Sequence, residues 1–420
     1  MSNATDWGPI ADVRDRSPLL RSYAEQYRES TPFENLVVGV TAPLTPHTGL
    51  FVDVLATGGG EVLVTGEAGT THADVVEWLR GRSGVTPLAE AGMTADELVD
   101  TRRELLESEP DLLADDGAHL LSLIHDEFSE VATGVRGACE QTTGGITRLQ
   151  AMNEQGALAF PVYDVNGTPM KQHFDNVHGT AESSLSAITS LTNAMVAGSV
   201  AVVAGYGHCG RGIARKLRAL GARTVVTEVD PRKALEALAD GHDVRPMGEA
   251  VADADFVVTA TGRYRILRRE HVDALADGTV IASIGSAIEI DSDALEDEAT
   301  ETEQSKPGIT QYRFSDDRHV TLLTGGQVVN LSAPGSAGNP SEVMDTTFAM
   351  MVRGLAELAD GVDMSPGLYP LPDYIDREVA CEKLDSMDVE IDEITDTQRA
   401  YHDQWALHDT GPSDGSSKSQ

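Results

Sequence analysis

Lysine is scarce in this chain of 420 residues, with only six lysines among 31 basic residues and 68 acidic residues against them. The net charge of −37 argues against nucleic acid as a partner, because phosphates would be repelled, and equally against an anionic membrane surface. The acidic excess is spread along the chain rather than gathered in one tail. We interpret the composition as halophilic, suited to a high-salt cytosol whose ions screen self-repulsion, with an ordinary acidic protein as the alternative.

Cysteine and long hydrophobic runs are also lacking. Cys139, Cys209 and Cys381 are too few and too scattered for a disulfide framework, and no CxxC pair indicates a metal site. Met1 to Asp15 has no apolar run of the kind that a signal peptide needs, and no segment reaches the roughly 18 apolar residues of a membrane span. The sequence predicts a cytoplasmic protein without a metal, long enough for two domains with separate cores.

Apolar strands alternate with amphipathic helices, which is typical of an α/β fold with doubly wound parallel sheets. Strands and helices expected early in the chain are Leu36–Val40, Glu61–Val64, Ala73–Leu79 and Thr94–Leu105. A functional loop or turn, rich in Gly and Thr, is expected at Gly134–Leu149. A second series of strands is expected at Val200–Ala204, Thr224–Thr227, Asp255–Ala260 and Val280–Ile284, followed by an amphipathic stretch at Ser341–Leu358 and a disordered end at Gly411–Gln420.

A glycine motif follows the first strand of the second series. Val200–Ala204 runs into the pattern GxGxxG and then into a helical stretch, Ile213–Leu220. Gly205 permits the tight turn, Gly207 lets the backbone approach a pyrophosphate, and Gly210 allows close packing of helix on strand. The helix N-terminus offers free N–H groups to the phosphates, so the motif predicts a dinucleotide site.

The next strand ends at Glu228, whose carboxylate is placed to hold both ribose hydroxyls of a dinucleotide. Asp230 adds negative charge beside it, which disfavours a 2′-phosphate. The strand, the helix and the acid agree with one another, and this favours bound NAD over NADP and over a glycine-rich turn without a ligand.

Residues 165–176 read Val-Asn-Gly-Thr-Pro-Met-Lys-Gln-His-Phe-Asp-Asn, and Gly179-Thr180 follows. This segment resembles the adenosylhomocysteinase (S-adenosyl-L-homocysteine hydrolase) family, in which an Asn…Lys…Asp-Asn block precedes the NAD domain. Further blocks in the same order are Asp115-Asp116-Gly117, Glu140-Gln141-Thr142-Thr143, Val226-Thr227-Glu228-Val229-Asp230-Pro231, Thr259-Ala260-Thr261-Gly262, Val329-Asn330-Leu331, Pro340-Ser341-Glu342-Val343-Met344 and Leu371-Pro372-Asp373. The resemblance runs from about Leu36 to about Trp405, and it identifies the chain as a divergent, haloarchaeal-like member.

The resemblance implies a Rossmann NAD-binding domain inserted in a larger α/β substrate domain. The expected division places the first part of the substrate domain at 1–180, the NAD domain at 181–334, the return to the substrate domain with C-terminal helices at 335–405, and a disordered tail at 406–420. It also implies the activity: resident NAD⁺ oxidises the ribose 3′-hydroxyl, which acidifies C4′–H, homocysteine leaves from C5′, water adds, and the ketone is reduced again.

By resemblance, Lys171 and Asp175 lie at the 2′- and 3′-hydroxyls, and Lys171 helps remove the 3′-hydroxyl proton. A lysine serves as a base only if burial or positive neighbours lower its pKa. The alternative is a simple i,i+4 salt bridge worth a few tenths of a kcal/mol. Residues that the resemblance assigns to catalysis are Lys171, Asp175, Asp116, Asn166 and Gln141. Those that it assigns to NAD are Thr142, Thr143, Asn176, Gly205, Gly207, Gly210, Glu228, Ile284, Gly285, Asn330 and Asn339.

Several family motifs are altered. The His-Met-Thr, Gly-His-Phe-Asp, Gly-His-Pro-Ser and Ala-Glu-Gly-Arg motifs correspond to Ala42-Pro43-Leu44, Gly285-Ser286-Ala287-Ile288, Gly338-Asn339-Pro340-Ser341 and Thr324-Gly325-Gly326-Gln327, and a glutamate of the catalytic loop has become Gln141. One positioned acid or base contributes roughly 10²–10⁴-fold in rate, so losing histidines near C4′ and the leaving group weakens the elimination step while the oxidation by Lys171 and Asp175 is kept. His47 or His119 is a candidate substitute; a surface histidine is the alternative for each.

Three functions therefore stay open. The chain is an adenosylhomocysteinase with rearranged acid–base residues, a paralogue that oxidises the ribose of another nucleoside or thioether, or a silent NAD-binding partner of an active homologue. Retained Lys171, Asp175 and Asp116 count against the third. The resemblance also implies a homo-oligomer, a dimer or a tetramer, and a nucleoside thioether as the substrate.

Overall fold

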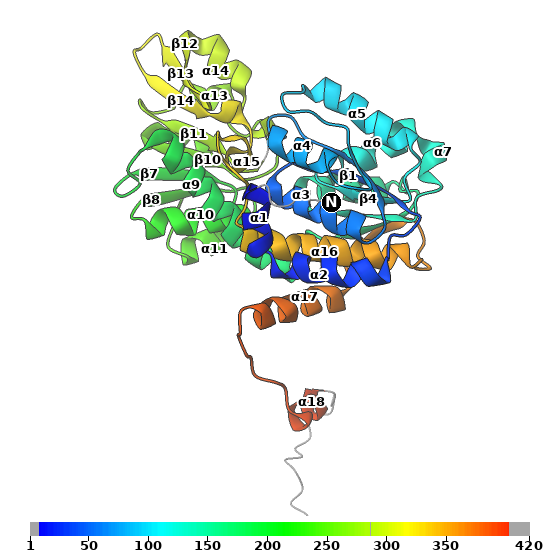
Figure 1. Ribbon diagram of the computed structural model, residues 1–420. Coiled ribbons are helices and arrows are strands. Elements are labelled where there is room, and N and C mark those ends of the chain that lie inside the picture. The colour runs from blue at the N-terminus through cyan, green and yellow to red at the C-terminus, as the bar shows by residue number, and fades with distance from the viewer. Residues whose placement is uncertain (1–7, 286, 403–420) are drawn as a thin grey trace, which may run out of the picture.

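The computed structural model describes residues 8–285 and 287–402, which form one parallel sheet and one mostly parallel sheet with helices on their faces (Figure 1). Ser286 and the predicted tails, 406–420 and Gly411–Gln420, lie outside the described residues. The predicted fold class, doubly wound α/β, is confirmed by the strand order of both sheets.

The first sheet has seven strands in the order β15-β6-β5-β4-β1-β2-β3, and every neighbouring pair is parallel. Its strands are β1 (Val37–Thr41), β2 (Glu61–Thr65), β3 (Val85–Pro87), β4 (Leu112–Asp115), β5 (Gly137–Glu140), β6 (Pro161–Asp164) and β15 (Gly367–Pro370). The helices of this part are α1 (Gly8–Asp15), α2 (Pro18–Ser30), α3 (Pro46–Thr57), α4 (Ala73–Arg80), α5 (Ala95–Glu107), α6 (His119–Glu127), α7 (Ser129–Ala132), α8 (Thr143–Glu154), α16 (Ser341–Ala359) and α17 (Asp373–Ser386).

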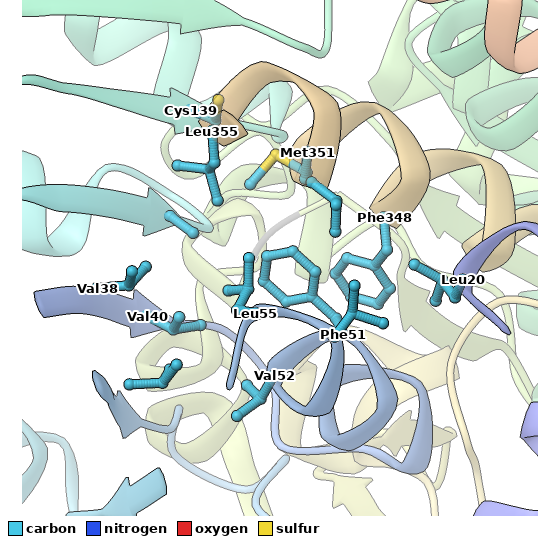
Figure 2. Packing of buried hydrophobic residues seen from close by; sticks show 14 of the residues in the cluster. Leu20, Val38, Val40, Phe51, Val52, Leu55, Cys139, Phe348, Met351 and Leu355 are labelled. Atoms are coloured by element: carbon cyan, nitrogen blue, oxygen red, sulfur yellow. The ribbon is translucent and has the colours of Figure 1, made fainter. Parts of the chain in front are cut away.

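Alternate residues of the first sheet's strands enter two different cores, as expected for a sheet covered on both faces. Val62 packs with α3 and α16, whereas its neighbour Leu63 packs with α5 and α6 on the other face. Figure 2 shows the first of these cores, where the rings of Phe51 on α3 and Phe348 on α16 stack at 4.7 Å between centroids. This stacking fixes α16 against the sheet next to the strand ends that carry the polar residues described below.

The second sheet has eight strands in the order β12-β13-β14-β11-β10-β7-β8-β9. Its strands are β7 (Val200–Ala204), β8 (Arg223–Thr227), β9 (Asp243–Val244), β10 (Phe256–Thr259), β11 (Val280–Ser283), β12 (Ala299–Lys306), β13 (Ile309–Phe314) and β14 (His319–Leu323). Pairing is parallel except at β12-β13-β14, which form an antiparallel extension at one edge. The helical segments are α9 (Thr180–Thr192), α10 (His208–Ala219), α11 (Pro231–Ala239), α12 (Met247–Ala250), η2 (Val251–Asp253), α13 (Arg269–Val272), η3 (Ala287–Glu289), α14 (Ser292–Glu298), η4 (Thr324–Gly326) and α15 (Val329–Ser332).

The chain passes between the sheets twice. It leaves the first sheet after β6 through a π-helix, η1 (Met170–Gly179), and α9, and it returns from the second sheet through α15 and α16 to β15. The second sheet is thus formed wholly within a break in the first, as an inserted domain would be. The exact domain limits, 180 and 334, stay a prediction.

Two local predictions were wrong. Gly134–Leu149 is not a loop, because it contains β5 and most of α8; β5 is a central strand buried on both faces, where small residues such as Gly137 are tolerated. The first Rossmann helix begins at His208 rather than at Ile213, since the last glycines of the motif form its first turn.

The C-terminal helix α18 (Asp396–His402) stands apart from both sheets at the end of an extended segment (Figure 1). Met387, Ile391 and Ile394 in that segment are exposed. Within the described ranges, no helix is both long enough and apolar enough to span a bilayer.

Candidate dinucleotide and substrate site

Each sheet has a switch point at which the strand order reverses, and ligands of such sheets bind outside the carboxyl ends of the strands there. In the first sheet this point lies between β1 and β4, because β2 and β3 continue the sheet on one side of β1, whereas β4, β5 and β6 continue it on the other. In the second sheet it lies between β7 and β10. Asp116 follows β4, and the GxGxxG motif follows β7, so the predicted substrate and dinucleotide residues lie at the two switch points.

The glycine loop after β7 has the shape of a dinucleotide cradle. Gly205 has a φ of +92°, and a side chain on Gly210 would come 2.0 Å from the Gly205 carbonyl oxygen. A Cβ on Gly207 would instead meet no atom within 4 Å among the described residues. The loop is therefore closed on its packed side and open at Gly207, where α10 begins, and this fits the pyrophosphate of NAD.

The carboxylate of Glu228 lies at the end of β8, beside this loop. It accepts hydrogen bonds from the backbone N–H groups of Tyr206 at 2.7 Å, Val229 at 2.7 Å and Asp230 at 3.0 Å. Asp230 caps α11 through the Arg232 N–H. These bonds fix the Glu228 carboxylate beside the glycine loop. Its contact with the ribose hydroxyls stays a prediction.

Replacing Gly207 by alanine tests the cradle, because the added methyl group clashes with no protein atom but enters the pyrophosphate space. The backbone at Gly207, with φ −74°, accommodates alanine. We expect unchanged thermal stability of the NAD-free protein and a loss of NAD affinity, measured by calorimetric titration. Gly248→Ala, which also meets open space on an exposed helix, is the control. Full NAD affinity in the Gly207 variant would contradict the assignment.

Lys171 and Asp175 form a buried ion pair on η1. The side chain of Asp175 is 0 % exposed and that of Lys171 is 9 % exposed, so this is no surface i,i+4 bridge. A π-helix is rare and is frequent at functional sites, since it re-aims side chains that an α-helix would place elsewhere. Burial, geometry and element type all favour the functional interpretation of the pair.

The glycine loop lies next to this pair. Gly212 on α10 touches η1 so closely that a Cβ there would come 2.1 Å from the Val177 carbonyl oxygen. Cys209, inside the loop, has its pKa raised to about 11, mainly by burial and then by the charge of Asp175, with Lys171 acting in the opposite direction. The catalytic candidates and the dinucleotide candidates therefore share one site.

Asp175 receives two further hydrogen bonds that join distant parts of the chain. Asn339 donates from Nδ2 to Oδ1 at 2.5 Å, and Thr347 on α16 donates from Oγ1 to Oδ2 at 2.6 Å. Asn339 in turn accepts from Asn330 Nδ2 at 2.9 Å and from Ser183 Oγ at 2.9 Å. Asn339, predicted for NAD, thus contacts Asp175 directly, and Asn330 is linked to it through Asn339. Thr347 was missed because an isolated threonine gives no sequence signal.

The amides predicted near the ribose also meet. Asn166 Oδ1 accepts from Asn176 Nδ2 at 3.1 Å and from Thr143 Oγ1 at 3.3 Å. The Thr142 hydroxyl has a structural task, since it caps α8 by accepting from the Gly145 N–H at 3.0 Å. The predicted contacts of Thr142 and Thr143 with NAD stay predictions.

Asp116 and Gln141 face each other across the ends of β4 and β5, with Gln141 Nε2 donating to Asp116 Oδ2 at 2.8 Å. Burial raises the pKa of Asp116 and of Asp115 to about 6. The charges of Lys171 and Asp175 also act on Asp116, so this group belongs to the same site. Gln141 Oε1 has no hydrogen-bond partner among the described residues and is free to accept one from a substrate.

Two buried glutamates were missed by the sequence analysis. Glu140 accepts from the N–H groups of Gly117 at 3.1 Å, Ala118 at 2.7 Å and Thr142 at 2.7 Å, and so ties the loop after β4 to the loop after β5. Glu289 accepts from the N–H groups after β10 and sits against Gly285, where a Cβ would come 2.0 Å from its Oε1. A buried Glu at a strand end was the only available signal for Glu140. Ile284 and Gly285 follow β11, and their contact with NAD stays a prediction.

The two histidines considered as substitutes lie in different settings. His47, in the first turn of α3, is buried, and its Nε2 lies 2.9 Å from Ser341 Oγ. His119 is the first residue of α6, and its Nε2 lies 3.5 Å from Glu67 Oε1. Burial lowers the pKa of each to about 4, so both are neutral at neutral pH.

The raised pKa of Asp116 predicts the pH dependence of the reaction. If the ionised carboxylate takes the substrate proton, the rate falls as pH drops through about 6, because protonation removes the base. Gln141→Glu exchanges an amide donor for a negative charge, which should raise the pKa of Asp116 and move this acid limb to higher pH. The pH profile of kcat/KM measures the position of the acid limb, and Gln155→Glu, at an exposed position, is the control. An acid limb that Gln141→Glu leaves in place would contradict the role of Asp116.

Comparisons with known proteins identify the family of this chain. Residues 176–336 match the family model described as "S-adenosyl-L-homocysteine hydrolase, NAD binding domain". The chain is 42% identical to an adenosylhomocysteinase of Thermotoga maritima, covering 92% of this chain and 96% of the relative. It is 40% identical to an S-inosyl-L-homocysteine hydrolase of Methanopyrus kandleri, covering 94% and 93%, and 39% identical to an adenosylhomocysteinase of Haloquadratum walsbyi, covering 93% and 91%. The family and the NAD cofactor predicted from the sequence are confirmed, and the chain belongs to the S-adenosyl-L-homocysteine hydrolase family.

Proposed function

We propose that this protein is an NAD-dependent hydrolase that cleaves S-adenosyl-L-homocysteine to adenosine and homocysteine. The observation that carries the proposal is the buried Lys171–Asp175 pair beside the glycine loop. A loop shaped for a dinucleotide and a lysine whose free amine is suited to take a sugar hydroxyl proton lie together in one site. A silent NAD-binding partner would need no such pair.

Asp175 positions Lys171 rather than taking a proton itself. Lys171, Asn339 and Thr347 donate hydrogen bonds to its two oxygens, and these bonds fix the orientation of the carboxylate. The fixed carboxylate of Asp175 and the backbone of η1 together set the position of Lys171 Nζ. NAD, when bound, supplies the two-electron oxidation of the 3′-hydroxyl and its later reversal; Lys171, as the free amine, takes the hydroxyl proton and returns it on reduction.

Asp116 is our candidate for the second proton transfer, at C4′ or at the leaving sulfur. It lies at the switch point of the first sheet, its pKa of about 6 is close to neutral pH, and Gln141 orients it. A group with a pKa near the working pH serves as both base and acid. Asp116 thereby makes the proton transfer that histidines make in the family, since those histidines are absent from this chain.

The inosine analogue is the second candidate substrate, since relatives named S-inosyl-L-homocysteine hydrolase are 40% and 39% identical to this chain. The two thioethers differ only at purine C6. The experiment incubates the protein, in high salt, with each thioether and follows free thiol and nucleoside. Thiol release from the adenosine compound supports the proposal; release from the inosine compound alone assigns the second substrate; release from neither overturns both.

We further infer a cytoplasmic homo-oligomer. The segment after α17 supports oligomerisation, because its apolar residues Met387, Ile391 and Ile394 are exposed on an arm that leaves the body of the molecule (Figure 1). Apolar side chains gathered on a projecting segment are typical of a contact with another chain.

Deleting residues 387–420 tests the arm. We expect a smaller assembly than that of the full chain, because the arm's apolar contacts are lost, and light scattering after gel filtration measures the mass. A chain that ends at residue 402 keeps the arm and serves as the control. An unchanged assembly after the longer deletion would contradict the inference.

A further inference from the structure

We propose that Glu67 and the guanidinium groups beside it form the subsite for the zwitterionic amino-acid end of the thioether substrate. This inference rests on the proposed function and adds the part of the site that distinguishes an amino-acid thioether from a plain nucleoside.

Glu67 follows β2, at the carboxyl edge of the first sheet and next to the switch-point strand β1. Its Oε1 has no hydrogen-bond partner among the described residues, and the neutral ring of His119 lies 3.5 Å from it. Burial, and then the negative charge of Asp116, raise the pKa of Glu67 well above its usual range. A carboxylate in this setting is stabilised by an incoming cation.

Arg102 supplies the second, independent observation. It is 8 % exposed, and its Nη2 donates to the Gly66 carbonyl oxygen at 3.2 Å. Its Nε has no partner within the described part of the chain, although the charges of Glu67 and Asp115 act on it. Arg148, which donates to the Gly117 carbonyl oxygen at 3.1 Å, brings another guanidinium group near Glu67. An unpaired carboxylate oxygen and an unpaired guanidinium N–H match an ammonium and a carboxylate, respectively.

The order of these groups along the site matches the order of groups in the substrate. Gln141 joins Asp116 to the end of β5, and the ring of His119, three residues after Asp116, lies 3.5 Å from Glu67 Oε1. The charges of Lys171 and Asp175 act on Asp116 from the other side of this chain of groups. The ribose 3′-hydroxyl is followed in the same way by C4′ and C5′, then by sulfur, and then by the amino acid. A substrate whose 3′-hydroxyl meets Lys171 and whose C5′ meets Asp116 therefore extends its amino acid toward Glu67.

The test compares S-adenosyl-L-homocysteine with 5′-methylthioadenosine, which carries the same nucleoside and a thioether but no amino acid. NADH formation in the NAD-loaded enzyme reports ribose oxidation for both compounds. For Glu67→Gln we expect the KM of S-adenosyl-L-homocysteine to rise about 10- to 100-fold, the usual range for losing a bond to a charged group, while that of 5′-methylthioadenosine stays the same. Glu67→Lys should raise the KM of S-adenosyl-L-homocysteine further, since the new positive charge repels the ammonium of the substrate.

Glu61→Gln, at the exposed start of β2, is the matched control and should change neither KM. Equal KM changes for both compounds in the Glu67 variants, or no change for either, would overturn the subsite. If the wild-type enzyme oxidises neither compound, the proposed function fails, and the subsite falls with it. If the wild-type enzyme oxidises both compounds and the Glu67 variants keep both KM values, only the subsite is overturned and the proposed function stands.

Discussion

Lys171→Ala is expected to lower the rate of NADH formation on nucleoside binding by roughly 10²–10⁴-fold while NAD stays bound. Lys171 Nζ pairs with Asp175, and the pair is buried beside the glycine loop. Its removal deletes the group that we propose takes the 3′-hydroxyl proton but touches no group that we assign to the dinucleotide. Stopped-flow NADH absorbance measures the rate, and calorimetric titration measures NAD affinity.

Lys216→Ala is the matched control, because Lys216 makes an ion pair at the surface with Glu182 on a neighbouring helix. That pair should contribute at most about 1 kcal/mol and nothing to the reaction. A Lys171 variant that forms NADH at the wild-type rate would remove Lys171 from its assigned role. Loss of NAD binding together with the rate would instead indicate a structural role.

Asp345→Ala is expected to destabilise the protein by about 3–5 kcal/mol, the usual cost of breaking a buried ion pair. Asp345 on α16 is fully buried and accepts from Lys383 Nζ at 2.8 Å. It also caps α2 by accepting from the backbone N–H groups of Leu19 and Leu20 at 3.3 and 3.0 Å. Without it, Lys383 keeps a buried charge with no counterion and α2 loses its cap.

Thermal and urea denaturation of the Asp345 variant, with exposed Asp360→Ala as the control, measure this loss. The double variant Asp345→Leu with Lys383→Met should be less destabilised than the sum of the two single variants, because it leaves no charge unpaired. Strictly additive losses, or an Asp345→Ala variant as stable as the wild type, would show that the pair is not the link between α2, α16 and α17.

Local patterns in the sequence were enough to place the dinucleotide loop. Gly205, Gly207 and Gly210 have fixed spacing between a strand and a helix, and Glu228 ends the next strand, so neighbours along the chain carry the whole signal. The resemblance added Lys171 and Asp175. The π-helix that holds them was not predicted, because i→i+5 bonding has no sequence pattern that distinguishes it from an α-helix.

The missed contacts are those between residues far apart in the chain. Thr347 and Asn339 reach Asp175 across 172 and 164 residues, and Asp345 reaches Leu20 across 325. Such pairs depend on how α16 returns from the second sheet, which no local periodicity specifies. Gly134–Leu149 was mistaken for a loop for a related reason: burial of β5 by both helix layers permits small residues that local propensity disfavours.

We propose that bound NAD faces a ribose 3′-hydroxyl next to Lys171, and two compounds that differ only in that hydroxyl test this arrangement. The NAD-loaded enzyme is mixed in a single turnover with S-adenosyl-L-homocysteine or with its 3′-deoxy counterpart, and NADH absorbance and free thiol are followed together. We expect both signals with the first compound and neither with the second, because only the first carries a 3′-hydroxyl to oxidise. Thiol release from the 3′-deoxy compound, or thiol release without any NADH, would contradict it.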